Sequence, residues 1–106
     1  MHDLKWSESE KKIARRAFQA ALTAELAEVM VDFKARAAAA AVPGDLWSIE
    51  EHLSRRRCEI DEKYDYRYSQ LIRVFGRLLR EGRIQEAQLV GLSEEKLSFI
   101  RLAGSL

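Results

Sequence analysis

The sequence predicts an all-α fold with two long helices, the second of them extended, and a small helical head at the C-terminus, assembled as a homodimer. The 106 residues are 47% hydrophobic and 33% charged and include one proline, a balance typical of a helical globular protein rather than a disordered one. Apolar residues recur every three or four positions along most of the chain, which indicates amphipathic helices. A chain of this length suits one domain, residues 1–106.

The first helix is expected within residues 1–42. Ser7 and Glu10 have the spacing of a capping box, in which the hydroxyl accepts the amide of the third helical residue and the carboxylate reaches back. Apolar residues follow at helical spacing as far as Phe33, and an alanine-rich tract continues with strong helix formers. Because proline disfavours helix at the residue before it, the helix should end before Pro43.

A second, long helix is expected over residues 45–81, with Asp45 as its N-cap and Gly82 as the glycine that ends it. From Leu46 to Leu78 the apolar residues are separated by three or four positions without a break. The stretch "KYDYRYSQL" places tyrosines at every second position, as in a strand, but no turn signals flank it. We therefore assign Tyr64, Tyr66 and Tyr68 to the helix and treat their alternation as coincidence.

The length of this second helix predicts a dimer. Its 36 residues from Leu46 to Glu81 would span about 54 Å, whereas a compact domain of this size is roughly 34 Å across. An uninterrupted helix would therefore extend beyond its own core and need a second subunit to cover its apolar stripe. The predicted dimer interface consists of Leu46, Trp47, Ile49, Leu53, Ile60 and Tyr64.

The helical head is expected over residues 83–106. A short helical piece from Ile84 to Val90 should end at Gly91, and Ser93 can cap a last helix. Short apolar elements after a long helix favour a small compact unit.

Composition gives little support to catalysis, cofactors or metals. The two histidines, His2 and His52, are far apart in the chain, and Cys58 is the only cysteine, so no thiolate metal site can form. No apolar run is long enough to cross a bilayer and no signal peptide is evident. We expect a cytoplasmic, non-enzymatic protein that does not bind a membrane.

Basic residues outnumber acidic ones nine to five between Arg55 and Arg83. Such a segment could contact phosphates, but acidic neighbours three and four residues away can neutralise it. Protein recognition is the favoured alternative, because Arg, Tyr and Trp often dominate interface energies. Trp47 is either a core residue or an interface anchor with Glu51 and Arg57 as its polar rim.

The stretch from Asp45 to Gly82 resembles the fluorescence recovery protein family of cyanobacterial photoprotection. The shared motifs are Asp-Leu-Trp at Asp45–Trp47, Leu-Ser-x-x-Arg at Leu53–Arg57, and Glu-Ile-Asp-x-Lys-Tyr-Asp-x-Arg at Glu59–Arg67. Val-Phe at Val74-Phe75 and Leu-Leu-x-Glu-Gly at Leu78–Gly82 complete the pattern. The resemblance covers most of the chain.

The resemblance implies an all-helical homodimer without enzymatic activity. It also implies binding to the C-terminal domain of the light-activated orange carotenoid protein, its detachment from the phycobilisome, and a faster return to the resting orange state. By position, Trp47, Glu50, Glu51 and Arg57 would form the partner-binding patch, while Arg73, Phe75 and Lys96 belong to the head.

Three positions depart from the family pattern. Glu50-Glu51 stand where the family has His-Asp, and Arg73 stands where an aromatic is expected. An alternative function is therefore a helical dimer of the same type that binds a different protein in a bacterium without phycobilisomes.

Overall fold

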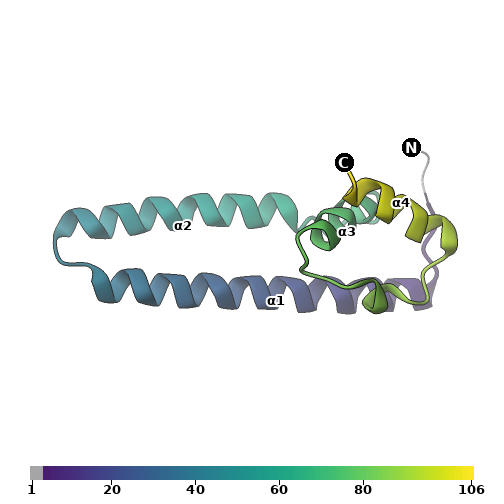
Figure 1. Ribbon diagram of the computed structural model, residues 1–106, viewed down its shortest axis with the longest axis horizontal. Coiled ribbons are helices and arrows are strands. Elements are labelled where there is room, and N and C mark those ends of the chain that lie inside the picture. Colours follow the sequence, from purple (N-terminus) through teal and green to yellow (C-terminus); the bar gives the residue numbers. More distant parts are fainter. Residues whose placement is uncertain (1–3) are drawn as a thin grey trace. The chain divides into compact units, whose positions relative to one another are not determined.

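The computed structural model describes residues 4–106 and is all-α over that range, as predicted. Figure 1 shows the helices α1 (Glu8–Ala39), α2 (Pro43–Lys63), α3 (Leu71–Arg80) and α4 (Glu94–Gly104), with a 3₁₀ helix η1 (Glu86–Leu89) between α3 and α4. The chain divides into two compact units. The hairpin unit is Leu22–Lys63, and the head unit joins the chain up to Ala21 with Tyr64–Leu106. His2 lies outside the described residues.

The start of α1 has the predicted capping box. The amide of Glu10 donates to the Ser7 hydroxyl over 3.2 Å, and the Ser7 amide donates to Glu10 Oε1 over 3.0 Å. Both helix-end amides are thereby satisfied. The helix ends at Ala39, before Pro43 as expected.

The start of α2 differs from the prediction, because Asp45 is not its N-cap. Pro43 is the first helical residue, a position where its missing N–H costs nothing. Asp45 lies a little further into the helix, and its Oδ2 accepts the amides of Ala41 and Val42 over 2.8 and 3.1 Å. These two bonds, that from Ala41 first, hold the pKa of Asp45 below its ordinary value. The Asp45 carboxylate thus stabilises the connection between α1 and α2 by accepting hydrogen bonds from two backbone amides that precede the helix.

The predicted unbroken helix over residues 45–81 is wrong. The helix α2 ends at Lys63, and a non-helical segment precedes α3. In this segment Tyr64 and Tyr66 both meet Phe18 edge-on, with ring centroids 5.4 and 4.8 Å apart. Tyr68 contacts Trp6 at 5.9 Å. A helix would point Tyr66 away from its neighbours, whereas the broken path brings all three rings into one aromatic cluster.

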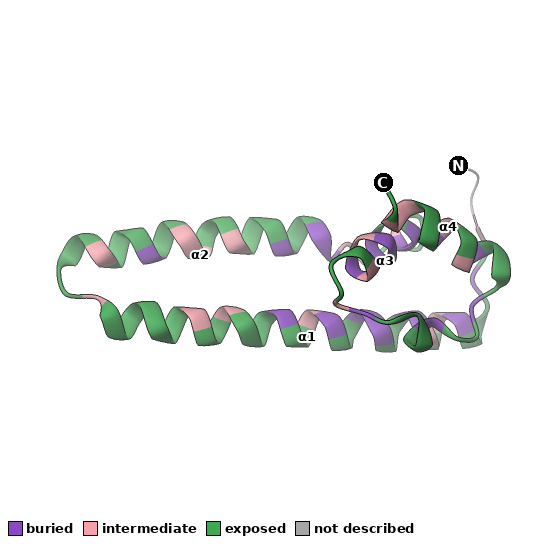
Figure 2. Ribbon diagram, in the orientation of Figure 1, coloured by how far each residue is buried: buried purple, intermediate pink, exposed green. Residues whose placement is uncertain are grey.

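The head unit has a core of apolar side chains from both ends of the chain. Figure 2 shows the buried residues concentrated in α3 and along the first turns of α1. The largest fully buried apolar side chains of the unit are Phe75, Leu71, Leu78, Ile84, Leu89, Ile100 and Val74. The predicted head of residues 83–106 is therefore only part of the unit, since its core also needs α3 and the start of α1.

The end of α3 confirms the predicted role of Gly82. Its φ is +74°, its amide donates to the Leu79 carbonyl, and the Arg83 amide donates to the Leu78 carbonyl. This pair of bonds is a Schellman motif, which favours glycine because of the left-handed backbone. The predicted short helix from Ile84 to Val90 is reduced to η1.

The start of α4 is also as predicted. The Ser93 hydroxyl accepts the Lys96 amide over 3.2 Å and so caps the helix. In addition, Glu10 Oε2 accepts the Ser93 amide over 2.9 Å, which links the capping residue of α4 to α1 inside the head unit.

The hairpin unit consists of the later part of α1 and α2, joined by a short connection. Few of its side chains are buried: Ile49 and Ile60 are its buried apolar residues. Figure 2 shows most residues of these two antiparallel helices as exposed, and large apolar side chains such as Leu46 and Trp47 are among them.

Candidate functional site

The two helices of the hairpin unit form an open apolar groove on one of their faces. Phe33 and Ala37 of α1 line one side. The α2 side chains that line it are Leu46, Ile49, Glu50, Leu53, Ser54 and Arg57. The groove has a volume of about 440 Å³. We refer to these eight residues as the hairpin groove.

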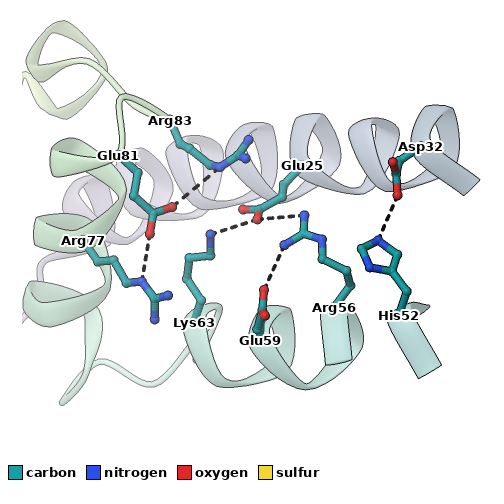
Figure 3. A network of polar contacts seen from close by, with 9 residues as sticks. All are labelled: Glu25, Asp32, His52, Arg56, Glu59, Lys63, Arg77, Glu81 and Arg83. Carbon is teal, nitrogen blue, oxygen red and sulfur yellow. Dashed lines mark hydrogen bonds and ion pairs between the residues drawn. The ribbon is translucent and has the colours of Figure 1, made fainter. Parts of the chain in front are cut away.

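Charged pairs between α1 and α2 hold the groove together. Glu25 is 1% exposed and accepts hydrogen bonds from Lys63 Nζ over 2.9 Å and from Arg56 Nη2 over 3.4 Å. Arg56 also pairs with Glu59 over 3.2 Å, as Figure 3 shows. A buried carboxylate is tolerated only when it is paired and hydrogen-bonded. These contacts therefore fix which turns of the two helices face each other.

A second cross-helix contact lies further along the hairpin. Asp32 Oδ2 meets His52 Nε2 at 2.9 Å and Arg36 Nε at 2.8 Å. The hydrogen bond from Arg36 is the main cause, and that from His52 a lesser one, of a pKa of Asp32 below its ordinary value. His52 is thus occupied by a carboxylate across the hairpin. Among residues 4–106, no three histidine, cysteine or acidic side chains are grouped so that they could hold a metal ion.

Two of the four residues predicted for the partner-binding patch line the hairpin groove. Glu50 and Arg57 line the groove beside Leu46 and Leu53. The Arg57 side chain is 84% exposed, with Asp61 at 3.8 Å as its salt-bridge partner. An exposed arginine beside apolar side chains is typical of the rim of a protein interface.

Trp47 and Glu51 are not among the residues that line the groove. They are four residues apart and so share the neighbouring face of α2, with Trp47 63% exposed. An indole this exposed is not a core residue of the hairpin unit. Of the two interpretations of Trp47, the core residue is therefore wrong for the single chain, and the interface anchor stays a prediction.

The remaining predicted residues lie in the head unit. Arg73 is exposed on α3 and donates to the Gln70 side chain over 3.1 Å. Phe75 is 0% exposed. Lys96 is buried, and its Nζ donates to Glu10 Oε1 over 3.1 Å and to the Lys5 carbonyl over 2.6 Å. Phe75 and Lys96 therefore support the head from within.

Tyr64 also belongs to the head unit, where it is buried against Phe18. It therefore belongs to a different unit from Leu46 and Leu53 of the groove. Ile60 is buried within the hairpin unit.

Sequence reasoning did not assign Phe33 and Ala37 to the site. Phe33 did carry a signal, since it lies on the apolar stripe of α1. Ala37 lies in the alanine-rich tract, where the pattern does not distinguish a lining residue from an exposed one.

Over residues 4–106, no helix is both long and apolar enough to cross a membrane. The described chain is therefore an all-helical protein with a well-packed head and a hairpin whose exposed apolar groove and charged rim suit protein recognition.

Comparison with known proteins shows the family of this chain. Residues 6–103 match the family model described as photoprotection regulator fluorescence recovery protein. The chain is 38% identical over 101 residues to the fluorescence recovery protein of Synechocystis sp. PCC 6803, covering 95% of this chain and 93% of that one. It belongs to the fluorescence recovery protein family, whose members are regulators of photoprotection, and the resemblance seen in the sequence is confirmed.

Solved structures agree with this assignment. The fluorescence recovery protein of Fremyella diplosiphon superposes with a TM-score of 0.90 at 35% identity, over 96% of this chain and 100% of that one. The Synechocystis sp. PCC 6803 protein gives a TM-score of 0.90 at 37% identity, with the same coverage.

Proposed function

We propose that this chain is a non-enzymatic regulator that forms a homodimer through its hairpin unit and acts in the cytoplasm on an orange carotenoid protein. It binds the C-terminal domain of the photoactivated partner and accelerates its return to the resting orange state. The observation that carries the proposal is the hairpin groove with its charged rim, in a chain of the photoprotection-regulator family.

The argument for a dimer rests on uncovered apolar surface. In the hairpin unit the exposed large apolar side chains are Leu26, Met30, Val31, Phe33, Val42, Leu46 and Trp47. Exposed apolar patches of this kind on a soluble protein mark interaction sites. A second copy that covers Leu46, Trp47 and Leu53 would bury part of this surface, whereas Ile49 and Ile60 of the predicted interface are already buried within the hairpin unit. Tyr64 is left out of this proposed interface because it is already buried in the head unit.

Light scattering tests the dimer. The native chain should have twice the monomer mass of 12.2 kDa. Leu46→Asp places a charge in the groove at an exposed position and should give monomers without unfolding the helices. Val90→Asp places the same charge at an exposed apolar position of the head unit and serves as the control. A mass near 12.2 kDa for the native chain at micromolar concentration would refute the dimer.

The regulatory step follows from differential binding. A protein that binds the compact state of its partner more tightly than the expanded state shifts the equilibrium by that difference in affinity. Trp47 supplies apolar contact area, while Glu50, Glu51 and Arg57 supply the charges that select the partner's surface.

Dark recovery of a photoconverted orange carotenoid protein, followed by its absorbance, tests the activity. The native chain should speed recovery, and both Trp47→Ala and Arg57→Glu should remove most of the acceleration. The controls are Val90→Ala for an exposed apolar residue and Lys34→Glu for an exposed cation on α1 that does not line the groove. An unchanged recovery rate at saturating native chain would refute this activity and favour a different protein partner, as Glu50-Glu51 allow.

A further inference from the structure

The first three turns of α1 carry four basic side chains that lie beside two tyrosines of the head unit. These residues, Lys11, Lys12, Arg15 and Arg16, are referred to as the basic face. Together with Glu8 and Tyr68 they line an open hollow of about 500 Å³. All of these residues belong to the head unit, whereas the residues of the hairpin groove belong to the hairpin unit.

The basic face has an excess of positive charge over the acidic side chains beside it in the described part of the head unit. Glu8 pairs with Lys11 at 3.3 Å. Glu10, the other acidic residue of the first turn, is buried and already paired with Lys96. Within residues 4–106, no carboxylate pairs with Lys12, Arg15 or Arg16, and all three are exposed. The four basic side chains lie beside one exposed carboxylate, that of Glu8, so the described residues of this surface carry an excess of three positive charges.

Aromatic contacts order part of this surface before any ligand binds. The Arg15 guanidinium carbon lies 4.1 Å from the centroid of the Tyr66 ring, and Lys11 Nζ lies 5.4 Å from that of Tyr68. The two rings are themselves fixed, since Tyr66 packs against Phe18 and Tyr68 against Trp6. A cation held over a ring loses less conformational freedom when it binds an anion, which favours affinity.

The chemistry of the surface points to carboxylates rather than to nucleic acid. The stretch from Glu8 to Arg16 is about 12 Å long at ~1.5 Å per residue, too short for the roughly 6–10 phosphate contacts of a typical DNA-binding surface. Single strands are usually held by bases stacked on exposed aromatic faces. Here the faces of Tyr66 and Tyr68 are occupied by Arg15 and Lys11.

A membrane surface is a poor fit for a different reason. A helix that lies on a bilayer inserts its apolar face between the lipids. On this part of α1 the apolar residues Ala14, Ala17 and Phe18 are buried in the head unit, so the helix has no free apolar face to insert.

We infer that the basic face is a second protein-docking surface, which binds a segment rich in aspartate and glutamate. Arg15 and Arg16 pair with carboxylates of the segment, and Lys11 and Lys12 add longer-range attraction. The inference does not depend on the proposed function, because it concerns other residues and another unit.

The test measures binding of a fluorescein-labelled acidic peptide of alternating glutamate and glycine to the full chain by fluorescence anisotropy. At about 50 mM salt the peptide should bind, and its affinity should fall as salt is raised. The double variant Lys12→Glu/Arg16→Glu should bind at least about tenfold more weakly. Its helicity and melting temperature should be unchanged, since neither side chain has an ion-pair partner among residues 4–106.

A matched double variant separates a specific surface from general charge. Lys34→Glu/Arg55→Glu makes the same change in net charge at exposed positions of the hairpin unit and should keep the affinity within about twofold of native. Equal losses in the two double variants, or no peptide binding at low salt, would overturn the inference. Tighter binding of a labelled single-stranded oligonucleotide or of phosphatidylglycerol vesicles than of the peptide would also overturn it. The assay contains no carotenoid protein, so its result is distinct from that of the recovery assay.

Discussion

The head unit and the hairpin unit both consist of helices, but they differ in where their apolar side chains point. In the head unit, side chains from α1, α3 and α4 face one another, and Phe75, Leu71 and Leu78 are completely buried. In the hairpin unit, two long helices share a few buried residues and expose a groove. Helix length therefore does not measure stability here. The short helices α3 and α4 form the packed core together with the first turns of α1, whereas the rest of α1 and α2 expose the groove.

The polar contacts reinforce this difference. In the hairpin unit, Glu25 with Lys63 and Asp32 with His52 set the pairing of the helices. In the head unit, Glu10 with Lys96 and Ser93 tightens a unit that apolar packing already stabilises. Ion pairs align elements with little gain in free energy when the charges must also be desolvated, so the hairpin unit should be the weaker of the two.

The largest effect is expected from the head core. Phe75→Ala should lower the free energy of unfolding by about 4 kcal/mol, because it leaves a cavity in a fully packed site. Ile49→Ala, at the open groove of the hairpin unit, should also lower the free energy of unfolding. Its effect should be smaller than that of Phe75→Ala by at least about 1 kcal/mol. Urea unfolding followed by circular dichroism measures both. Equal losses would contradict the contrast between the units.

The next largest effect tests the buried ion pair of the hairpin unit. Lys63→Met should cost roughly 3 kcal/mol, since it removes a charged partner of the buried Glu25 carboxylate. The double variant Glu25→Leu/Lys63→Met replaces both charges with apolar groups and should recover most of that loss. Thermal unfolding of the two variants provides the comparison. If the double variant is as unstable as the single one, the pair contributes more than alignment.

A smaller effect should follow from crowding α3 against α4. In Gly76→Ala the new methyl group would lie 2.6 Å from Ala103 Cβ and 2.9 Å from the Gly104 nitrogen, so it should destabilise the head unit by about 1–3 kcal/mol. Gly44→Ala is the matched control in the hairpin unit. Its added carbon meets nothing within 4 Å, and alanine should stabilise the helix by about 0.5–1 kcal/mol. A neutral Gly76→Ala would show that the two helices separate easily.

The smallest effect concerns acid stability of the head unit. Burial acts to raise the pKa of Glu10, but hydrogen bonds from the Ser7 and Ser93 amides and from Lys96 outweigh it and leave the pKa lowered. A carboxyl with a lowered folded-state pKa contributes stability above its unfolded pKa, and this contribution is lost as the pH falls through the folded value. Stability should therefore fall below about pH 4.3, the ordinary pKa of glutamate.

Glu10→Gln should make this acid-induced loss shallower. Glu8→Gln, at an exposed position of the same turn, should leave it nearly unchanged. Thermal melts between pH 3 and pH 7 distinguish the two variants. A slope that is the same in Glu10→Gln and in the native chain would show that Glu10 does not govern the acid transition.

Much of the fold could be predicted from local chemistry. The capping box at Ser7 and Glu10, the stop at Gly82 and the cap at Ser93 each depend on residues within about four positions, so the sequence displays them directly. Family motifs between Asp45 and Gly82 supplied the assignment and the candidate surface, of which Glu50 and Arg57 line the groove.

The break after Lys63 could not be predicted in the same way. Apolar spacing continues across it, and its cause is the contact of Tyr64 and Tyr66 with Phe18, more than forty positions earlier. Long-range contacts override local periodicity and leave no trace in a short window. The roles of Phe75 and Lys96 depend in the same way on packing with distant residues.

The two tryptophans of the chain are divided between the two units. Trp6 is 8% exposed, with Lys96 and Tyr68 against its ring, while Trp47 is 63% exposed on α2. Indole emission shifts to shorter wavelength in apolar surroundings, so each unit has an intrinsic optical reporter. Loss of the short-wavelength emission of Trp6 would report unfolding of the head unit. A blue shift of the long-wavelength emission of Trp47 would report binding of a second chain to the hairpin unit, and neither measurement needs an added label.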